Sequence, residues 1–183
     1  MHAQILKLIV AALLIVPVFF APVVAQTQEM ELLEQLRDAP ESDARRLERE
    51  LGLIWDRSGS ASMDLLLKRG REALEAKNTA RAIEHFSALI DHAPTFAEGW
   101  HARATAYFRA GLFGPALDDL QHALVLNPNN YNALYGLGVM FQEFGDVARA
   151  AEAYDRVLTI NPHHEQAKEA RERLAGRGIN QTL

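Results

Sequence analysis

Few residues of this chain have the types and the spacing that catalytic or metal chemistry would need. His163, His164 and Glu165 follow one another and are of the types that bind metal ions. Adjacent residues point in different directions on a helix, however, and no thiol or further ligand cluster supports them. We therefore interpret these three residues as the solvated start of a helix and predict no metal site.

Two glycine-containing stretches are equally weak signals for an enzyme. Gly136 and Gly138 resemble part of a dinucleotide-binding loop, but the third glycine and the preceding strand are missing. Ser58 and Ser60 neighbour a glycine without forming the nucleophile elbow of serine hydrolases. The chain has no cysteine, which excludes disulfides, thiolate ligands and a cysteine nucleophile. The sequence therefore predicts a protein that is not an enzyme and binds no cofactor.

The composition indicates a folded, mildly acidic protein. Hydrophobic residues make up 49% of the 183 residues, which is enough for a buried core in one domain of ordinary size. The 19 Lys and Arg residues against 24 Asp and Glu residues give a formal charge of −5. A nucleic-acid-binding protein would show a basic surface instead, so we expect no nucleic-acid partner.

The first 25 residues have the layout of a secretory signal peptide. Lys7 precedes an apolar run over residues 8–20, and Val23 and Ala25 would occupy the −3 and −1 positions of a cleavage site. The run is shorter than the ~20 residues that span a bilayer. We predict a signal peptide over residues 1–25, cleavage after Ala25, and an exported, periplasmic protein. In the alternative, the segment stays uncleaved and is the chain's single attachment to a membrane.

Three blocks of 34 residues align with one another without gaps, over residues 63–96, 97–130 and 131–164. Small residues recur at the eighth position of each block, alanine at the twentieth and proline at the thirty-second: Gly70, Ala104, Gly138; Ala82, Ala116, Ala150; Pro94, Pro128, Pro162. The spacing of the apolar positions predicts two helices per block, because residues three and four apart share a helix face. The small residues let the two helices approach closely, and the proline ends the second helix.

This pattern resembles the tetratricopeptide repeat family, whose signature combines W-x2-L-G-x2-Y, A-x3-F and a final proline. The third block fits it best, through Leu134, Leu137, Gly138, Phe141, Ala150, Tyr154 and Pro162. The resemblance covers residues 63–164. It implies an all-α fold, a right-handed α-solenoid of antiparallel helix hairpins with three repeat units.

Further helices flank the repeats. Within residues 26–62, apolar stripes predict a helix pair over 29–38 and 41–57, which we interpret as an N-terminal cap or a degenerate repeat, followed by a linker. Residues 165–175 predict a charged capping helix on the last repeat, since a solenoid needs a polar end. Residues 176–183 are expected to form a disordered tail.

The seventh position of the first two blocks holds arginine, where the family usually has leucine. We predict structural ion pairs for Arg69 and Arg103 with acidic residues of the second helices: Glu84, Asp118 and Asp119. A functional anion site is the alternative. If Arg103 is only structural, its replacement by leucine is expected to be neutral or stabilising.

In the family, four positions of each first helix line a concave surface. In this chain, Asp64 occupies one of these positions. The residues at the other positions are our candidates for a protein-binding groove: Leu67, Arg71, Leu74, Glu98, His101, Thr105, Phe108, Asn132, Tyr135, Val139 and Gln142. The mixture suits an extended peptide or a helix, with Phe108, Tyr135 and His101 as aromatic anchors. The alternative is an ordinary solvated helix face.

Some family members hold a C-terminal carboxylate with lysine, asparagine and arginine residues of the groove. The matching positions of this chain are occupied by Leu67, Arg71, Ala102, Asn132 and Gly136, so that clamp is absent. We expect a non-enzymatic protein-interaction module of the cell envelope, an adaptor or assembly factor that binds another protein or a peptide. The alternative is a membrane-anchored scaffold of the same fold.

Overall fold

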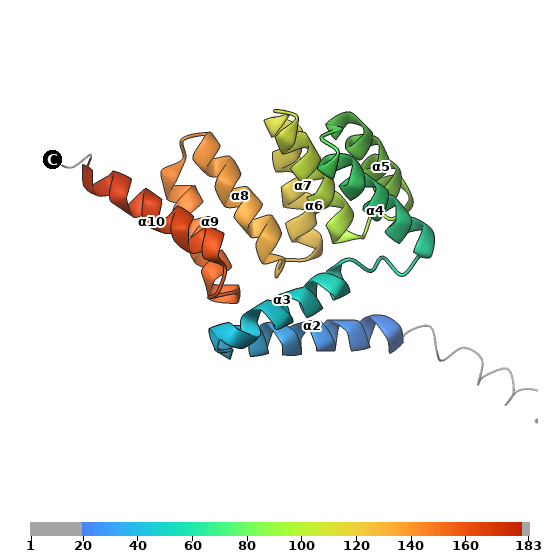
Figure 1. Ribbon diagram of the computed structural model, residues 1–183, viewed down its shortest axis with the longest axis horizontal. Coiled ribbons are helices and arrows are strands. Elements are labelled where there is room, and N and C mark those ends of the chain that lie inside the picture. Colours follow the sequence, from blue (N-terminus) through green and yellow to red (C-terminus); the bar gives the residue numbers. More distant parts are fainter. Residues whose placement is uncertain (1–19, 181–183) are drawn as a thin grey trace, which may run out of the picture.

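The computed structural model describes the backbone of residues 20–180 and the side chains of residues 26–176. Nine α-helices and no strand occur within this range, which confirms the predicted all-α helical repeat solenoid. The helices are α2 (Phe20–Asp38), α3 (Glu41–Trp55), α4 (Ala61–Glu75), α5 (Thr79–His92), α6 (Ala97–Arg109), α7 (Phe113–Leu126), α8 (Tyr131–Glu143), α9 (Val147–Ile160) and α10 (Glu165–Asn180). In Figure 1 the hairpins α4–α5, α6–α7 and α8–α9 stand next to one another in chain order.

The turn inside each hairpin has the same construction in all three repeats. Lys77, Gly111 and Gly145 stand at equivalent positions and have positive φ angles of 59°, 74° and 76°. Glycine adopts this left-handed conformation at little cost, which is why it stands at two of the three turns. In the first and third repeats the next residue caps the following helix. The side chains of Asn78 and Asp146 accept hydrogen bonds from the backbone N–H groups three residues ahead, at 3.1 and 3.0 Å.

Close approach of the two helices depends on the small residue at the eighth repeat position. A Cβ atom built on Gly138 would lie 2.5 Å from Cε1 of Tyr154, whose ring is buried against that glycine. Gly70 has the same relation to the buried ring of Phe86. The large residue of the second helix therefore fills the volume that the missing side chain leaves.

The N-terminal helix pair does not cap the first repeat, which corrects the sequence-based interpretation. Its apolar stripes, including Leu36 and Leu51, share one core with residues of the third repeat and α10, such as Leu134 and Leu174. The first repeat packs around a separate core. We call α2 and α3 the N-terminal arm. Figure 1 shows the arm along one edge of the solenoid, below the ends of the repeat helices.

Polar contacts fix the arm along this edge. Glu29 accepts hydrogen bonds from Trp55 Nε1 at 2.7 Å and from Asn127 Nδ2 at 3.1 Å. Glu48 accepts one from Asn161 Nδ2 at 2.7 Å. Asn127 and Asn161 occupy the same position of two successive repeats, just before the proline that ends the second helix. The arm thus forms hydrogen bonds to the same asparagine position of the second and third repeats.

Both ends of the described range differ from the expected boundaries. Helix α10 continues to Asn180, so residues 176–180 are helical and do not belong to a disordered tail. Residues 181–183 of the expected tail lie outside the described range. A charged pair one turn apart, Arg173 with Glu169, supports the preceding part of α10. Helix α2 begins at Phe20 and includes the expected cleavage position, Ala25, whereas residues 1–19 of the expected signal peptide lie outside the described range. Among the described residues, no helix combines the length and apolar character needed to cross a membrane.

Candidate peptide-binding groove

A hollow of about 330 Å³ lies between the first helices of the second and third repeats. Its walls contain six of the residues expected in the groove: His101, Thr105, Phe108, Asn132, Tyr135 and Val139. Ala104, Leu120, Gly136 and Met140 complete the lining. Leu120 and Met140 are buried residues of a core that the second and third repeats share, so the hollow has an apolar floor.

Gly136 keeps this floor open. A Cβ atom at this position would lie 3.1 Å from Cδ2 of Leu120, so a side chain here would press on the floor and fill part of the hollow. In the family pattern, Gly136 stands at a position where other members have a clamp residue. Its role as a spacer, and the contribution of Leu120 from a second helix, depend on how α7 and α8 pack.

The other expected groove residues lie elsewhere. Leu67 and Leu74 are 2% and 8% exposed and belong to the first-repeat core, so they offer no surface to a partner. Gln142 accepts a long hydrogen bond of 3.4 Å from the hydroxyl of Tyr154. Arg71 and Glu98 are engaged in a polar cluster. The hollow is therefore shorter than the three-repeat groove that the family pattern implied.

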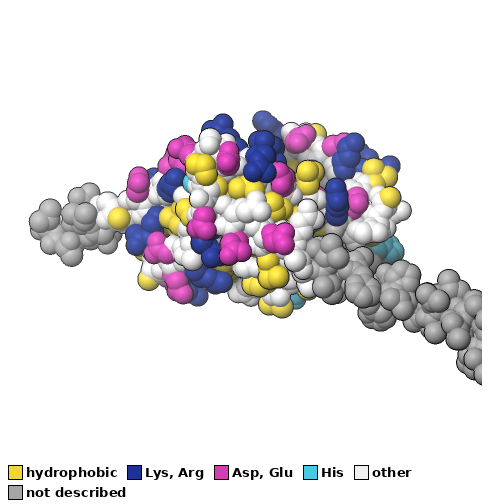
Figure 2. Space-filling model, turned by 90° about the horizontal axis from the view of Figure 1, so that it is seen from below, with side chains coloured by type: hydrophobic (Ala, Val, Ile, Leu, Met, Phe, Trp, Pro, Cys, Tyr) yellow, Lys and Arg dark blue, Asp and Glu magenta, His cyan; other side chains and the backbone are white. Residues whose placement is uncertain are grey.

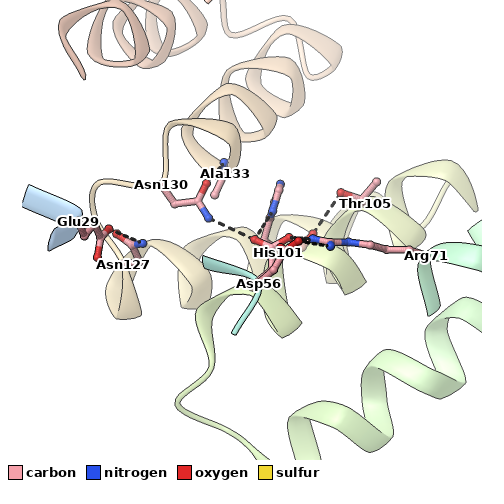
Figure 3. Close-up of polar contacts among 9 residues, drawn as sticks. Glu29, Asp56, Arg71, His101, Thr105, Asn127, Asn130 and Ala133 are labelled. Carbon is pink, nitrogen blue, oxygen red and sulfur yellow. Dashed lines mark hydrogen bonds and ion pairs between the residues drawn. The ribbon is translucent and has the colours of Figure 1, made fainter. Parts of the chain in front are cut away.

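A polar cluster joins Asp56, the residue that follows α3, to the first two repeats (Figure 3). Arg71 donates from Nη1 and Nη2 to the two carboxylate oxygens of Asp56, each at 2.7 Å. Its Nη2 also donates to Glu98 Oε1 at 2.7 Å. Glu98 Oε2 lies 3.1 Å from His101 Nδ1 and 3.5 Å from Asn130 Nδ2. Glu98 is 7% exposed, and a buried carboxylate of this kind requires such partners.

These contacts shift the protonation equilibria of the two buried partners in opposite directions. Burial alone would lower the pKa of His101, but the carboxylate of Glu98 outweighs it and raises that pKa above its ordinary value. Burial would likewise raise the pKa of Glu98, yet His101 and Arg71 together lower it. The pair thus favours imidazolium and carboxylate. Since His101 also lines the hollow, its state sets whether Nε2 is a donor or an acceptor there.

We expect the stabilisation that His101 supplies to depend on pH. Its folded-state pKa lies above the ordinary 6.5, so the contribution is complete below about pH 6.5 and is lost as pH rises through the raised pKa. At low pH the same stabilisation is lost as pH falls through the lowered pKa of Glu98, because the carboxylate becomes protonated. The difference in unfolding free energy between the wild type and His101→Asn, measured in urea titrations, should therefore shrink as pH rises above about 6.5.

The His101→Asn variant is needed as a reference because a second histidine, His164, gives the unfolding free energy a pH dependence of the opposite sign. Burial lowers the pKa of His164, so its contribution is lost as pH falls below its ordinary value of 6.5. This effect is common to both proteins and cancels in the difference. A difference that stayed constant over the alkaline range would contradict the assigned Glu98–His101 interaction.

The two arginines at the seventh repeat position behave differently. Arg103 donates from Nε and Nη2 to both oxygens of the buried carboxylate of Asp119, at 2.7 and 2.9 Å, as expected for a structural ion pair. Arg69 is exposed and makes no ion pair within the described residues. The predicted pair for Arg69 is therefore wrong, because water solvates its guanidinium and no buried partner is needed.

The histidines at the start of α10 are not simply solvated. His164 is 8% exposed, and its Nδ1 accepts a hydrogen bond from the backbone N–H of Ala167 at 3.2 Å. It therefore caps α10 from a buried position, in the way that Asn130 caps α8 through the N–H of Ala133. His163 is half-buried. No group of three His, Cys, Asp or Glu side chains suited to a metal ion occurs in the described part of the chain.

Comparison with known proteins agrees with this architecture. The sequence profile of the tetratricopeptide repeat matches residues 67–118 and 101–165, which together span more than half of the chain. The chain belongs to the tetratricopeptide repeat family. A TPR repeat-containing protein of Rhizobium etli is 31% identical over 151 residues, which cover 80% of this chain and 74% of that protein. Repeats of this family are protein-interaction modules that bind peptides.

Solved tetratricopeptide structures share the fold of the repeats. The TPR domain of Sgt2 from Aspergillus fumigatus is 26% identical and superimposes with a TM-score of 0.62 over 67% of this chain and 82% of that domain. The first TPR domain of Spaghetti, bound to an HSP90 peptide, is 23% identical, with a TM-score of 0.61 over 64% of this chain and 93% of that domain. At this identity the second likeness concerns the fold alone.

Proposed function

We propose that this tetratricopeptide-repeat protein is a non-enzymatic adaptor or assembly factor that binds a segment of another protein in the hollow between α6 and α8. The observation that carries the proposal is the lining of that hollow. Phe108, Tyr135 and Val139 are half-buried above an apolar floor, and no lysine, arginine or carboxylate lines the hollow. Such a surface favours apolar side chains of a peptide or a helix.

The aromatic lining continues beyond the hollow. Phe108 packs against Phe113 with ring centroids 5.6 Å apart, and Phe113 packs against Phe144 at 6.4 Å. Phe113 and Phe144 are 36% and 52% exposed and belong to the turn ends of neighbouring hairpins. A bound segment would therefore run from Asn132 past Phe108 toward the turn edge, roughly along the first helices.

A partner of the chaperone-tail type is not what this surface favours. Of the positions at which family members clamp a C-terminal carboxylate, Leu67 and Ala102 are buried and Arg71 is already paired with Asp56 and Glu98. The likeness to the domain that binds an HSP90 peptide therefore does not extend to these residues. The proposed partner contributes apolar contacts to the hollow.

Replacing Phe108 and Tyr135 with alanine is expected to abolish partner capture while leaving the fold intact. Each half-buried aromatic contributes a large share of an interface of this kind, and the pair should weaken binding by about a hundredfold. The measurement is photocrosslinking in the native cells, with a photoreactive amino acid in place of Val139, followed by mass spectrometry of the adducts.

Val125 provides the control position, because its side chain is 83% exposed on α7, outside the hollow. A crosslinker at Val125 should not give the adducts seen from position 139. Circular dichroism and thermal unfolding of the double alanine variant report whether it folds. If the folded variant keeps every adduct of the wild type, the hollow is not the binding site.

We further propose that the protein acts in the cell envelope after export and cleavage behind Ala25. The arm supports this, since Glu29, Leu32 and Leu36 lie downstream of Ala25 and would stay in the processed chain. The alternative is retention of the N-terminal segment as a membrane anchor. Mass spectrometry of the protein from separated periplasmic and membrane fractions distinguishes the two. An intact N-terminus in the membrane fraction would select the anchor, and cytoplasmic protein would refute export.

A further inference from the structure

A pocket of about 520 Å³ opens on the first repeat, where residues of α4, of α5 and of the turn between them line it. Arg69 and Ala73 lie on its α4 side, and Arg81 and His85 lie on its α5 side. In Figure 1 the hairpin α4–α5 ends the row of repeats, and the arm runs below the row. None of the pocket residues lines the hollow between α6 and α8, so this is a separate site.

The other two repeats show which partners their arginines have near the equivalent place. Arg103, at the seventh position of the second repeat, lies 5.5 Å from the ring centroid of Tyr107 and donates to both carboxylate oxygens of Asp119. Arg149, at the nineteenth position of the third repeat, lies 4.5 Å from the ring centroid of Phe141. The eleventh position thus supplies an aromatic ring to an arginine in both repeats. In the second repeat the twenty-third position adds a carboxylate.

The first repeat has an arginine at both positions and neither of these partners. Arg69 and Arg81 occupy the seventh and nineteenth positions, but Ala73 stands at the eleventh and His85 at the twenty-third. Both guanidinium groups are exposed and form no hydrogen bond or ion pair with any described residue. The pocket therefore lies where the other two repeats place an aromatic side chain.

The pocket has an excess of positive charge. Its lining contains two arginines and one carboxylate, that of Glu72, which lies 3.8 Å from the ammonium group of Lys68. Even when Glu72 is counted in full and His85 is neutral, one guanidinium has no opposite charge among the lining residues. Guanidinium groups bind the two oxygens of a carboxylate and also stack on aromatic faces. The pocket therefore suits an anion that has an aromatic ring.

We propose that this pocket binds a carboxylate with an aromatic ring beside it, presented by a segment of a partner protein. The ring occupies the volume that Ala73 leaves open and contacts the guanidinium groups of Arg69 and Arg81. The carboxylate pairs with these guanidinium groups, in the way that the second repeat pairs its own arginine and aspartate. The ligand thus supplies the two partners that the first repeat lacks. This site does not depend on the proposed function of the hollow.

The place of the pocket in the solenoid favours a protein as the carrier. In the second repeat, Arg103 also donates to Ser87 Oγ, which belongs to α5 of the preceding repeat. The first repeat follows the arm, and the arm shares its core with the third repeat and α10. The side of the first repeat where a preceding repeat would pack is therefore open to a segment of another protein.

The chemistry of the pocket can be tested with sodium phenylacetate, titrated into the ¹⁵N-labelled full chain. We expect saturable shifts of the backbone resonances of Ala73 and Asn78, which line the pocket. Phenylacetamide lacks the charge and acetate lacks the ring, so each should bind about tenfold more weakly. Arg69→Gln/Arg81→Gln should weaken phenylacetate binding by about tenfold as well. No saturable shift, or equal affinity for phenylacetate and acetate, would overturn the proposal.

Two further variants give the first repeat the partners that the other repeats have. Ala73→Phe introduces the residue type of the eleventh position of the third repeat, and His85→Asp offers Arg69 the carboxylate that Arg103 has. Each variant should abolish phenylacetate binding, because the chain itself then occupies the site. Circular dichroism reports which of them fold. A folded variant of either kind that binds phenylacetate like the wild type contradicts the proposal.

Arg149→Gln is the matched control, because it removes the same charge from the nineteenth position of the third repeat, outside the pocket. Figure 2 shows why a control is needed, since basic side chains also lie among acidic ones on the arm side of the molecule. Phenylacetate affinity should be unchanged in this variant, and equal weakening would mean non-specific attraction and refute the site. Phe108→Ala/Tyr135→Ala should also bind phenylacetate normally, so failure of the hollow and failure of the pocket are distinguishable.

The carrier is tested with a photoreactive amino acid in place of Ala76, an exposed residue of the pocket. Peptide mapping should place the adduct on a partner segment in which an aromatic residue neighbours an aspartate or glutamate. His85→Asp should remove this adduct. An adduct with a second copy of this chain, an adduct that persists in His85→Asp, or the absence of any protein adduct would overturn the assignment of a partner protein.

Discussion

Replacing Arg103 with leucine is expected to lower the free energy of unfolding by about 3 kcal/mol, because it strands a buried carboxylate. The Asp119 side chain is 6% exposed and receives two hydrogen bonds from this guanidinium. Arg103 also donates to Ser87 Oγ at 3.2 Å and lies over the rings of Trp100 and Tyr107. The loss of one partner of a buried pair costs more than the pair contributes. The expectation that leucine would be tolerated at this site therefore does not follow from the structure.

A double variant separates the cost of the unpaired Asp119 carboxylate from the net contribution of the ion pair. Arg103→Leu/Asp119→Leu removes the stranded charge and should recover most of the lost stability in urea unfolding, because apolar residues can replace a buried pair at little cost. Arg46→Leu breaks the exposed pair with Glu50 and should change stability by less than about 0.5 kcal/mol. If Arg103→Leu were as mild as Arg46→Leu, Asp119 would not depend on its partner.

Replacing Gly138 with alanine is expected to destabilise the third repeat by about 2 kcal/mol, although alanine is the better helix former. The added Cβ would lie 2.5 Å from Cε1 and 2.8 Å from Cδ1 of Tyr154. The ring cannot move aside easily, since Tyr154 is 1% exposed and packs in the core that the arm shares. Helices α8 and α9 must therefore separate, which costs contacts on both sides.

Gly52→Ala is the matched control, because Gly52 also lies inside a helix but a Cβ there would meet nothing within 4 Å. This change should raise the unfolding free energy by about 0.5–1 kcal/mol through helix propensity alone. Thermal and urea unfolding of both variants measure the contrast. Similar stabilisation in the two variants would show that close helix contact at Gly138 is not limiting.

The local construction of the repeats was available from the sequence. The 34-residue period, the small residue at the eighth position and the proline that ends the second helix predicted the three hairpins. Gly145 and Asp146 predicted the turn and the helix cap before α9. These features depend on residues within one repeat, where backbone conformation and helix geometry set the contacts. A pairing of Arg103 with an acidic residue of the second helix was predicted for the same reason, and the structure has Asp119, not Asp118, as the partner.

The position of the arm was decided only in three dimensions. The stripe of Leu32, Leu33 and Leu36 predicts a buried face, but an apolar face does not specify which other apolar face covers it. The deciding contacts join residues far apart in the chain, with Glu29 and Asn127 separated by 98 positions and Glu48 and Asn161 by 113. No local pattern encodes such pairs.

The candidate groove was likewise predicted only in part from the sequence. Repeat position placed Phe108, Tyr135 and Val139 on the inner face, where the structure has the hollow. Glu98 and Arg71 also stand at inner positions of the repeats, yet they pair with each other and with His101 and Asp56 in the polar cluster. Glu98 is buried there, whereas Arg71 stays 39% exposed but is already paired. The residue pattern predicted the repeats and their turns, and the resemblance to the family indicated the inner face. Only tertiary packing decided which inner residues stay accessible, because the arm supplies charges and apolar contacts that repeat periodicity does not specify.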